Sequence, residues 1–342
     1  MSENAPAPEE WRELYEAAIR VKELAPWQWM KENDTFGVQN PETGVNGFVS
    51  VMGTLGEHYA AALYLGGQAL YRLWDLEDSG PLADPRQLLE IPQLQASFED
   101  REQLDARDRA TIKALGLTFR GRQSWPQFRS YRPGYFPWYL ETDEARFLAV
   151  ALGQLCEVAP RFKADPSLFT VPDDEHHFVR VPRKEGDSLV WKDKVLHVPF
   201  EEKVYLDIPM DTAALNYLRT LLASKRQVEI DFFMLRARIQ ENRNERPVMP
   251  YALLCVDAQS GMVLDVQLLE ARPSLEAMWA MLPAQVVQQL ATLHLRPAAV
   301  RVRSDMLHQM LTPVSNSLGF KLIKRSHLRM LDPAKASLLE YM

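Results

Sequence analysis

The order of apolar patterns between Gln227 and His327 constrains the fold of this chain more than any other feature. Three strand-like runs, QVEIDFFMLRARI, YALLCVD and MVLDVQLLEA, precede a helical pattern that opens at Ser274. The strand AAVRVRS, a helix from Asp305, the strand FKLIKRS and a short last helix complete the order β-β-β-α-β-α-β-α. This order predicts a mixed sheet with helices on both faces, and we expect the strand near residues 228–237 to lie centrally.

The preceding residues predict a separate α+β unit. Helical patterns cover EEWRELYEAAIRVKELAP, GQALYRLWDLED, DARDRATIKALGL and the segment from Thr142, and Asp105 is the expected N-cap of the third helix. Strand and turn signals fall in TFGVQNPETGVNGFVSVMG, HYAAALYLG, QLQASFE, HHFVRV and SLVWKDKVLHVP. We expect an α+β domain over residues 1–205 and an α/β domain over residues 212–342, with the boundary near residues 205–212.

Apolar run lengths and cysteine usage indicate a globular protein of a reducing compartment. The longest apolar runs, such as AAALYLGG and FLAVALGQLC, are too short to span a bilayer. The acidic start MSENAPAPEE lacks the basic residues of a secretory signal. Cys156 and Cys255 lie in apolar patterns and are expected to be buried thiols. We therefore expect a cytoplasmic protein without a membrane partner.

Charge is distributed unevenly along the chain, whose formal net charge is −7. Residues 1–210 carry 23 Lys and Arg against 34 Asp and Glu, whereas residues 211–342 carry 16 against 12. Basic side chains on the last two strands permit contact with phosphate backbones. We favour a charged sheet edge that resists aggregation over a nucleic-acid partner. The basic residues concerned are Arg301, Arg303, Lys321, Lys324 and Arg325.

Two short motifs lack the arrangement that a ligand site requires. GTLGEHY contains Gly53 and Gly56, but both flanks have strand patterns and no GK[ST] follows, so the glycines predict turns and not a phosphate loop. His176 and His177 are neighbours at the start of a strand, where side chains point to opposite faces. We therefore expect no histidine or zinc site.

The aromatic segment SWPQFRSYRPGYFPWYLE allows two interpretations. Its rings alternate with Arg129 and Arg132, which is the composition of a base-stacking platform. The alternative, which we favour, is an aromatic wall of the N-terminal core. The rings are those of Trp125, Phe128, Tyr131, Tyr135, Phe136, Trp138 and Tyr139.

The order of elements, the turn DAQSGMVL and the strand end RVRSD resemble the ribonuclease H-like core of retroviral integrases and DDE transposases over residues 225–342. The resemblance implies a catalytic site in which Asp231 and Asp305 bind metal. It implies Glu340, 35 residues after Asp305, as the third catalytic acid, with Asp332 as the alternative. In that family such carboxylates hold two Mg²⁺ ions about 4 Å apart, which activate water and stabilise the leaving oxygen of a phosphodiester.

The same region also has features with a structural explanation. Met306-Leu307 stands where that family has Asn-Gly, and Asp305 and Asp257 also fit a helix N-cap and a turn former. The whole chain resembles a bacterial family that pairs two domains of unknown function, through Pro26-Trp27, FGVQNPETG and RPGYFPWYL. That second resemblance implies no activity.

Two functions stay open, and with them the question of whether the protein is an enzyme. The first is a non-catalytic binding or interaction protein with a degenerate ribonuclease H-like domain. It requires no cofactor, and its acidic, aromatic N-terminal domain would bind a protein partner. The alternative is a Mg²⁺-dependent nuclease or strand-transfer enzyme that acts on nucleic acid. Convergence of the carboxylates in space would discriminate between them.

Overall fold

The computed structural model of the protein describes residues 4–78, 85–186, 188–199, 207–235, 237–240, 242–243 and 245–340. Contacts divide the chain into two compact units, of which the first comprises Met1–Arg132 and Pro137–Lys203 and the second Pro133–Phe136 and Val204–Met342. Pro133–Phe136 belongs to the second unit and contacts it through the Phe136 backbone N–H, which donates to Pro247 O at 2.9 Å. The predicted boundary at residues 205–212 begins outside the described residues and stays a prediction.

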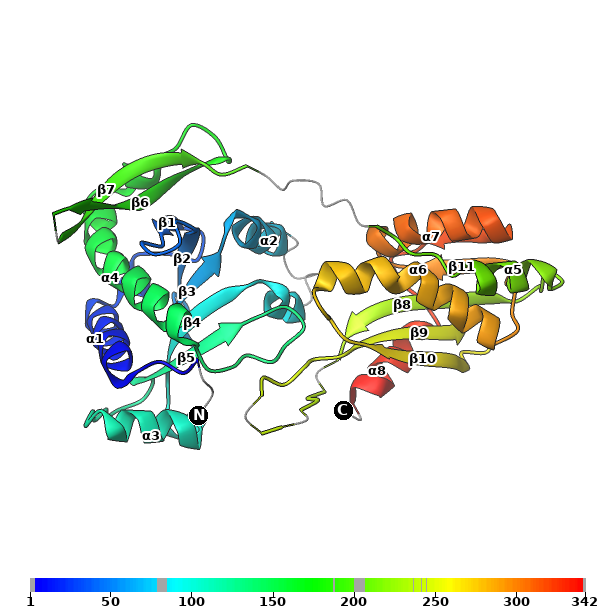
Figure 1. Ribbon diagram of the computed structural model, residues 1–342, viewed down its shortest axis with the longest axis horizontal. Coiled ribbons are helices and arrows are strands. Elements are labelled where there is room, and N and C mark those ends of the chain that lie inside the picture. The colour runs from blue at the N-terminus through cyan, green and yellow to red at the C-terminus, as the bar shows by residue number, and fades with distance from the viewer. Residues whose placement is uncertain are drawn as a thin grey trace. The chain divides into compact units, whose positions relative to one another are not determined.

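One mixed sheet forms the first unit (Figure 1), and its strand order is β5-β4-β3-β2-β1-β6-β7. β1 and β6 are parallel, and the other neighbours are antiparallel. Gly53 and Gly56, with φ of 133° and 76°, lie in the turn between β2 and β3, as predicted. The strands are β1 (Phe36–Gln39), β2 (Asn46–Met52), β3 (Tyr59–Leu65), β4 (Gln93–Glu99), β5 (Trp125–Tyr131), β6 (His176–Glu185) and β7 (Ser188–His197).

Helices cover both faces of this sheet because side chains alternate along each strand. Val49 and Val51 of β2 join the core beneath α1 (Pro8–Leu24) and α4 (Thr142–Ala164), whereas Phe48 joins the core beneath α2 (Gly67–Asp78). Asp105 caps α3 (Ala106–Ala114), as predicted: its Oδ1 accepts from the Arg107 and Asp108 backbone N–H groups, both at 2.9 Å. Local capping and strand alternation therefore fix the frame of the first unit.

A second mixed sheet, in the order β10-β9-β8-β11-β12, forms the core of the second unit. β8 is central, which confirms the prediction for the strand near residues 228–237. It pairs antiparallel with β9 and parallel with β11. The strands are β8 (Gln227–Met234), β9 (Tyr251–Asp257), β10 (Val263–Leu269), β11 (Ala299–Val302) and β12 (Lys321–Lys324).

Helices also lie on both faces of the second sheet (Figure 1). α5 (Thr212–Thr220), α6 (Leu275–Thr292) and α7 (Asp305–Leu318) share a core with Val228 and Ile230. α8 (Leu331–Glu340) packs on the opposite face, against Phe233 and Leu254. Among the described residues, no helix combines the length and apolar character needed to cross a membrane.

The N-cap of α7 corrects one expectation. Ser304, not Asp305, is the capping residue, and its Oγ accepts from the Leu307 backbone N–H at 3.1 Å. Asp305 lies in the first turn, where a negative charge is favoured by the helix dipole. Asp257 does form the predicted turn, because its Oδ1 accepts from the Gln259 and Ser260 backbone N–H groups at 3.0 and 2.8 Å.

Candidate functional site

A cluster of charged side chains lies between α8 and the strands β8 and β11. Alternation along β8 places Glu229 and Asp231 on the face that α8 covers, opposite Val228 and Ile230. The cluster has three acids and three bases, so its formal charge is zero. We call it the α8 charge cluster, and its members are Glu229, Asp231, Arg301, Arg303, Asp332 and Lys335.

Glu229 holds the N-terminal end of α8. The side chain is 1% exposed, and its Oε2 accepts from the Met330 and Leu331 backbone N–H groups at 2.8 and 2.9 Å. Its Oε1 lies 3.4 Å from Arg301 Nη1. The first N–H groups of a helix have no partner within the helix, and the helix dipole favours a negative charge there. Glu229 therefore has a complete structural role.

Asp231 is enclosed by cations. It is 4% exposed, and its Oδ2 lies 3.3 Å from Lys335 Nζ and 3.8 Å from Arg303 Nε. Arg303 also pairs with Asp332, whose Oδ2 accepts from the Leu328 backbone N–H at 3.2 Å. Lys335 Nζ lies 4.2 Å from the centroid of a phenyl ring on the same face. The carboxylate is thus neutralised by side chains of the protein itself.

The other predicted catalytic acids lie in different surroundings. The Asp305 side chain is 74% exposed and pairs with Lys324 of β12. Glu340 is exposed at the end of α8. Asp231 and Asp332 do come together, through their shared partner Arg303. Across the described ranges, no group of three His, Cys, Asp or Glu residues could hold a metal ion. Metal binding at Asp231 and Asp305 stays a prediction.

The basic residues expected on β11 and β12 are largely engaged with acids. Arg301 and Arg303 point to the same side, as alternation requires, and contact Glu229 and Asp231. Lys324 contacts Asp305. These pairs reduce the positive charge that the second unit can offer to phosphate groups.

Tyr135 and Phe136 of the aromatic segment belong to the second unit, whereas the part of the segment in the first unit has contacts typical of a core wall. Phe128 is 3% exposed and meets Tyr15 edge-on, with ring centroids 4.9 Å apart. The two arginines that alternate with the rings have acidic partners: Arg129 Nη2 lies 2.6 Å from Asp108 Oδ2, and Arg132 Nη2 lies 2.8 Å from a Glu144 oxygen. These contacts favour the wall over a base-stacking platform.

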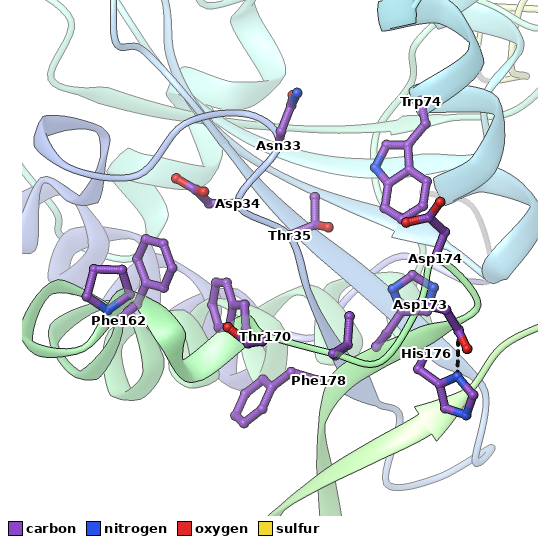
Figure 2. A pocket seen from close by; sticks show the side chains of 14 residues that line it. Asn33, Asp34, Thr35, Trp74, Phe162, Thr170, Asp173, Asp174, His176 and Phe178 are labelled. Atoms are coloured by element: carbon purple, nitrogen blue, oxygen red, sulfur yellow. Dashed lines mark hydrogen bonds and ion pairs between the residues drawn. The ribbon is translucent and has the colours of Figure 1, made fainter.

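A pocket of about 370 Å³ lies in the first unit (Figure 2). Segments near residues 33–35, 162–171 and 173–178 line it together with one side chain of α2. We call it the Trp74 pocket. Its lining combines the rings of Trp74, Phe162, Phe169 and Phe178, the acids Asp34, Asp173 and Asp174, and the histidines His176 and His177.

The two histidines of the pocket turn to different partners. His177 is 7% exposed, and its Nε2 lies 3.2 Å from the Tyr71 hydroxyl oxygen. Burial lowers the pKa of His177 below its usual value, with a smaller contribution from the neighbouring His176, so the ring is neutral near pH 7. His176 Nδ1 instead lies 2.6 Å from Asp173 Oδ1. This divergence agrees with the expectation from strand geometry.

Sequence comparison finds one match in each unit, although the first match runs through Pro133–Phe136, which the contacts assign to the second unit. A family model described as a domain of unknown function, DUF7309, matches residues 11–180, and a second, described as a domain of unknown function, DUF6930, matches residues 214–339. No curated protein matches the chain. The two matches agree with the expected pairing of two domains of unknown function. Neither match carries the ribonuclease H-like resemblance.

Proposed function

We propose that the protein is a non-catalytic binding protein whose second unit is a degenerate ribonuclease H-like domain. The observation that carries this proposal is the neutralisation of Asp231 by Lys335 and Arg303. The central position of β8 and its parallel pairing with β11 support the ribonuclease H-like resemblance. In this proposal the Trp74 pocket of the first unit is the recognition site, and no cofactor is required.

Simple electrostatics explains why the α8 charge cluster suits a structural role. A Mg²⁺ ion on Asp231 would have to displace or approach two cationic groups within 4 Å of the same carboxylate oxygen. Mg²⁺ also retains several waters, which require open space around the ligand. At 4% exposure, Asp231 offers little such space. Moving Lys335 aside would leave a buried carboxylate without its nearest counter-charge, which is costly.

The test compares the full chain with its Asp231→Asn variant in millimolar Mg²⁺ and Mn²⁺. We expect neither metal to raise the melting temperature of the wild type relative to the variant, because a ligand stabilises only a state that binds it. We also expect no metal-dependent cleavage of single-stranded or duplex DNA or RNA. A metal-dependent rise in melting temperature that disappears in Asp231→Asn, together with cleavage, would overturn the proposal in favour of a nuclease.

A further inference from the structure

The residues that line the Trp74 pocket include more acids than basic side chains. The fourteen residues that line it include three aspartates and neither Lys nor Arg. The neutral His177 adds no positive charge near pH 7. Acids gathered in a cleft raise the local concentration of cations. The pocket therefore favours a cation over a neutral or anionic ligand.

The three aspartates differ in how much of their hydrogen-bonding capacity the fold uses. Asp173 Oδ1 is taken by His176 and by the Glu175 backbone N–H at 3.0 Å. Asp34 Oδ2 accepts from the Lys31 backbone N–H at 2.7 Å. Within the ranges that the structure describes, the exposed carboxylate of Asp174 has neither a hydrogen-bond donor nor an ion-pair partner. Asp174 is therefore the acid most available to a ligand.

The walls of the pocket provide flat aromatic surfaces. Phe162 and Phe169 stack with ring centroids 4.5 Å apart, and Phe169 lies 5.5 Å from Phe178. Asp174 and Trp74 both line the pocket, and in the view of Figure 2 the Asp174 carboxylate overlaps the edge of the Trp74 indole. A planar cation can stack on such rings while its N–H groups donate to carboxylates. Guanidinium is planar and carries such N–H groups. A quaternary ammonium has no N–H group and could not donate to the carboxylates.

We propose that the Trp74 pocket binds a guanidinium group, held by the Asp174 carboxylate and the Trp74 ring. The volume of about 370 Å³ lies at the small end of ligand sites, which suits one side chain or a small molecule. The guanidinium comes either from a free small molecule or from an arginine side chain of a peptide. The inference rests on the binding role proposed above and names the ligand class of that site.

The experiment titrates the full chain with N-acetyl-arginine methylamide and follows the Trp74 indole N–H signal, assigned with Trp74→Leu, by NMR. The matched probe is N-acetyl-citrulline methylamide, which has nearly the same shape without the charge. We expect saturable binding of the arginine probe and at least about tenfold weaker binding of the citrulline probe. Equal affinity for both probes, or no binding of either at the highest soluble concentration, would overturn the proposal.

Variants identify the residues that make the contact. Asp174→Asn should weaken binding of the arginine probe about tenfold, because a charge-assisted hydrogen bond is lost. The control is Asp143→Asn, which removes a charge from an 83% exposed side chain on α4 outside the pocket. Trp74→Leu should also weaken binding by removing the ring face. Because this variant lacks the indole signal, its affinity and that of the wild type are compared by isothermal titration calorimetry. Unchanged affinity in both Asp174→Asn and Trp74→Leu would contradict the proposed contacts even if the probe binds elsewhere.

The source of the guanidinium is resolved by two further probes. Free arginine represents a small metabolite, and the blocked peptide Gly-Gly-Arg-Gly-Gly represents a protein partner. Tighter binding of the peptide than of the single-residue probe indicates a peptide partner, and tighter binding of free arginine indicates a small molecule. Failure of all guanidinium probes would leave the metal test of the second unit unaffected, so the two proposals fail independently.

Discussion

Glu229 and Asp231 in the second unit are 1% and 4% exposed, and each lies within 4 Å of a cation. Asp174 in the first unit is exposed, lines the same pocket as several aromatic rings, and has no ion pair with Lys or Arg among the described residues. Acids of the first kind stabilise the fold, because removing them leaves donors or counter-charges buried. Removing an acid of the second kind changes the stability of the fold little, and its carboxylate is available to a ligand. Stability and binding measurements can therefore separate the two kinds.

The largest expected effect is that of Glu229→Ala. The substitution removes the acceptor of two backbone N–H groups at the start of α8 and the buried counter-charge of Arg301. We expect the free energy of unfolding of the second unit to fall by about 3 kcal/mol. Urea titration followed by hydrogen exchange and mass spectrometry measures this, because the method reports α8 separately from the first unit.

The matched control for Glu229→Ala is Glu340→Ala. It makes the same chemical change at an exposed position of the same unit, and it should alter the free energy of unfolding by less than about 0.5 kcal/mol. Equal effects of the two substitutions, or unchanged protection of the α8 amides in Glu229→Ala, would show that the carboxylate does not hold the helix. Buried acids of the second unit would then not differ from the exposed Asp174 of the first unit in their contribution to stability.

Features set by a few neighbouring residues could be predicted from the sequence. The Asp105 cap and the Asp257 turn each depend on backbone groups two or three residues away. The central position of β8 followed from the order of elements. Local sequence did not decide the N-cap of α7, because Ser304 and Asp305 are both good capping residues. In the structure Ser304 is the N-cap.

The α8 charge cluster could not be predicted, because its contacts join residues between 29 and 104 positions apart. Lys335 and Asp231 are separated by 104 residues. Sequence spacing selected Glu340, but five residues along a helix correspond to a rotation of about 140°, so Glu340 and Lys335 cannot both face β8. Asp332 and Lys335, three residues apart, do share that face.

The Trp74 pocket was also missed by sequence reasoning, which treated His176 and His177 only as possible metal ligands. Its lining comes from segments as distant as Asn33 and Phe178, and only the folded chain brings them together. The available signal was the acidic run VPDDEHH, which is separated from Phe169 by one residue. An acidic run near an aromatic residue is common on protein surfaces. It indicates a binding site only where the structure shows that these residues line a cavity.

An intermediate effect is expected from the pH dependence of the first unit. Burial lowers the pKa of His177 below the value near 6.5 of an unfolded chain. Asp173 and Asp174 oppose this shift, whereas His176 adds to it, and the groups packed on the ring from other elements are Tyr71, Trp74 and Phe48. As pH falls below about 6.5, the unfolded chain takes up a proton first, so the stability that neutral His177 contributes is lost.

The measurement is urea unfolding of the wild type and of His177→Gln between pH 7 and pH 5. The wild type should lose stability relative to the variant as pH falls, with a slope of at most about 1.4 kcal/mol per pH unit. The variant cannot titrate at this position, so it serves as the reference at each pH. Parallel curves for the two proteins would mean that His177 takes up its proton equally in the folded and unfolded states.

The smallest expected effect on stability is that of Asp174→Asn. Asp174 is exposed, and among the described residues its carboxylate accepts no hydrogen bond, so the neutral isostere removes no contact of the fold. We expect the free energy of unfolding of the first unit to change by less than about 0.5 kcal/mol at pH 7. The same urea titration measures it, with hydrogen exchange in α2 and the 170–178 segment as the local readout. A loss of stability comparable to that of Glu229→Ala would place Asp174 among the acids that hold the fold, and the two units would no longer differ in their use of carboxylates.

An unchanged free energy of unfolding combined with weaker guanidinium binding in Asp174→Asn instead indicates that the Asp174 charge serves ligand binding. The charge would then contribute to binding without contributing to the stability of the first unit.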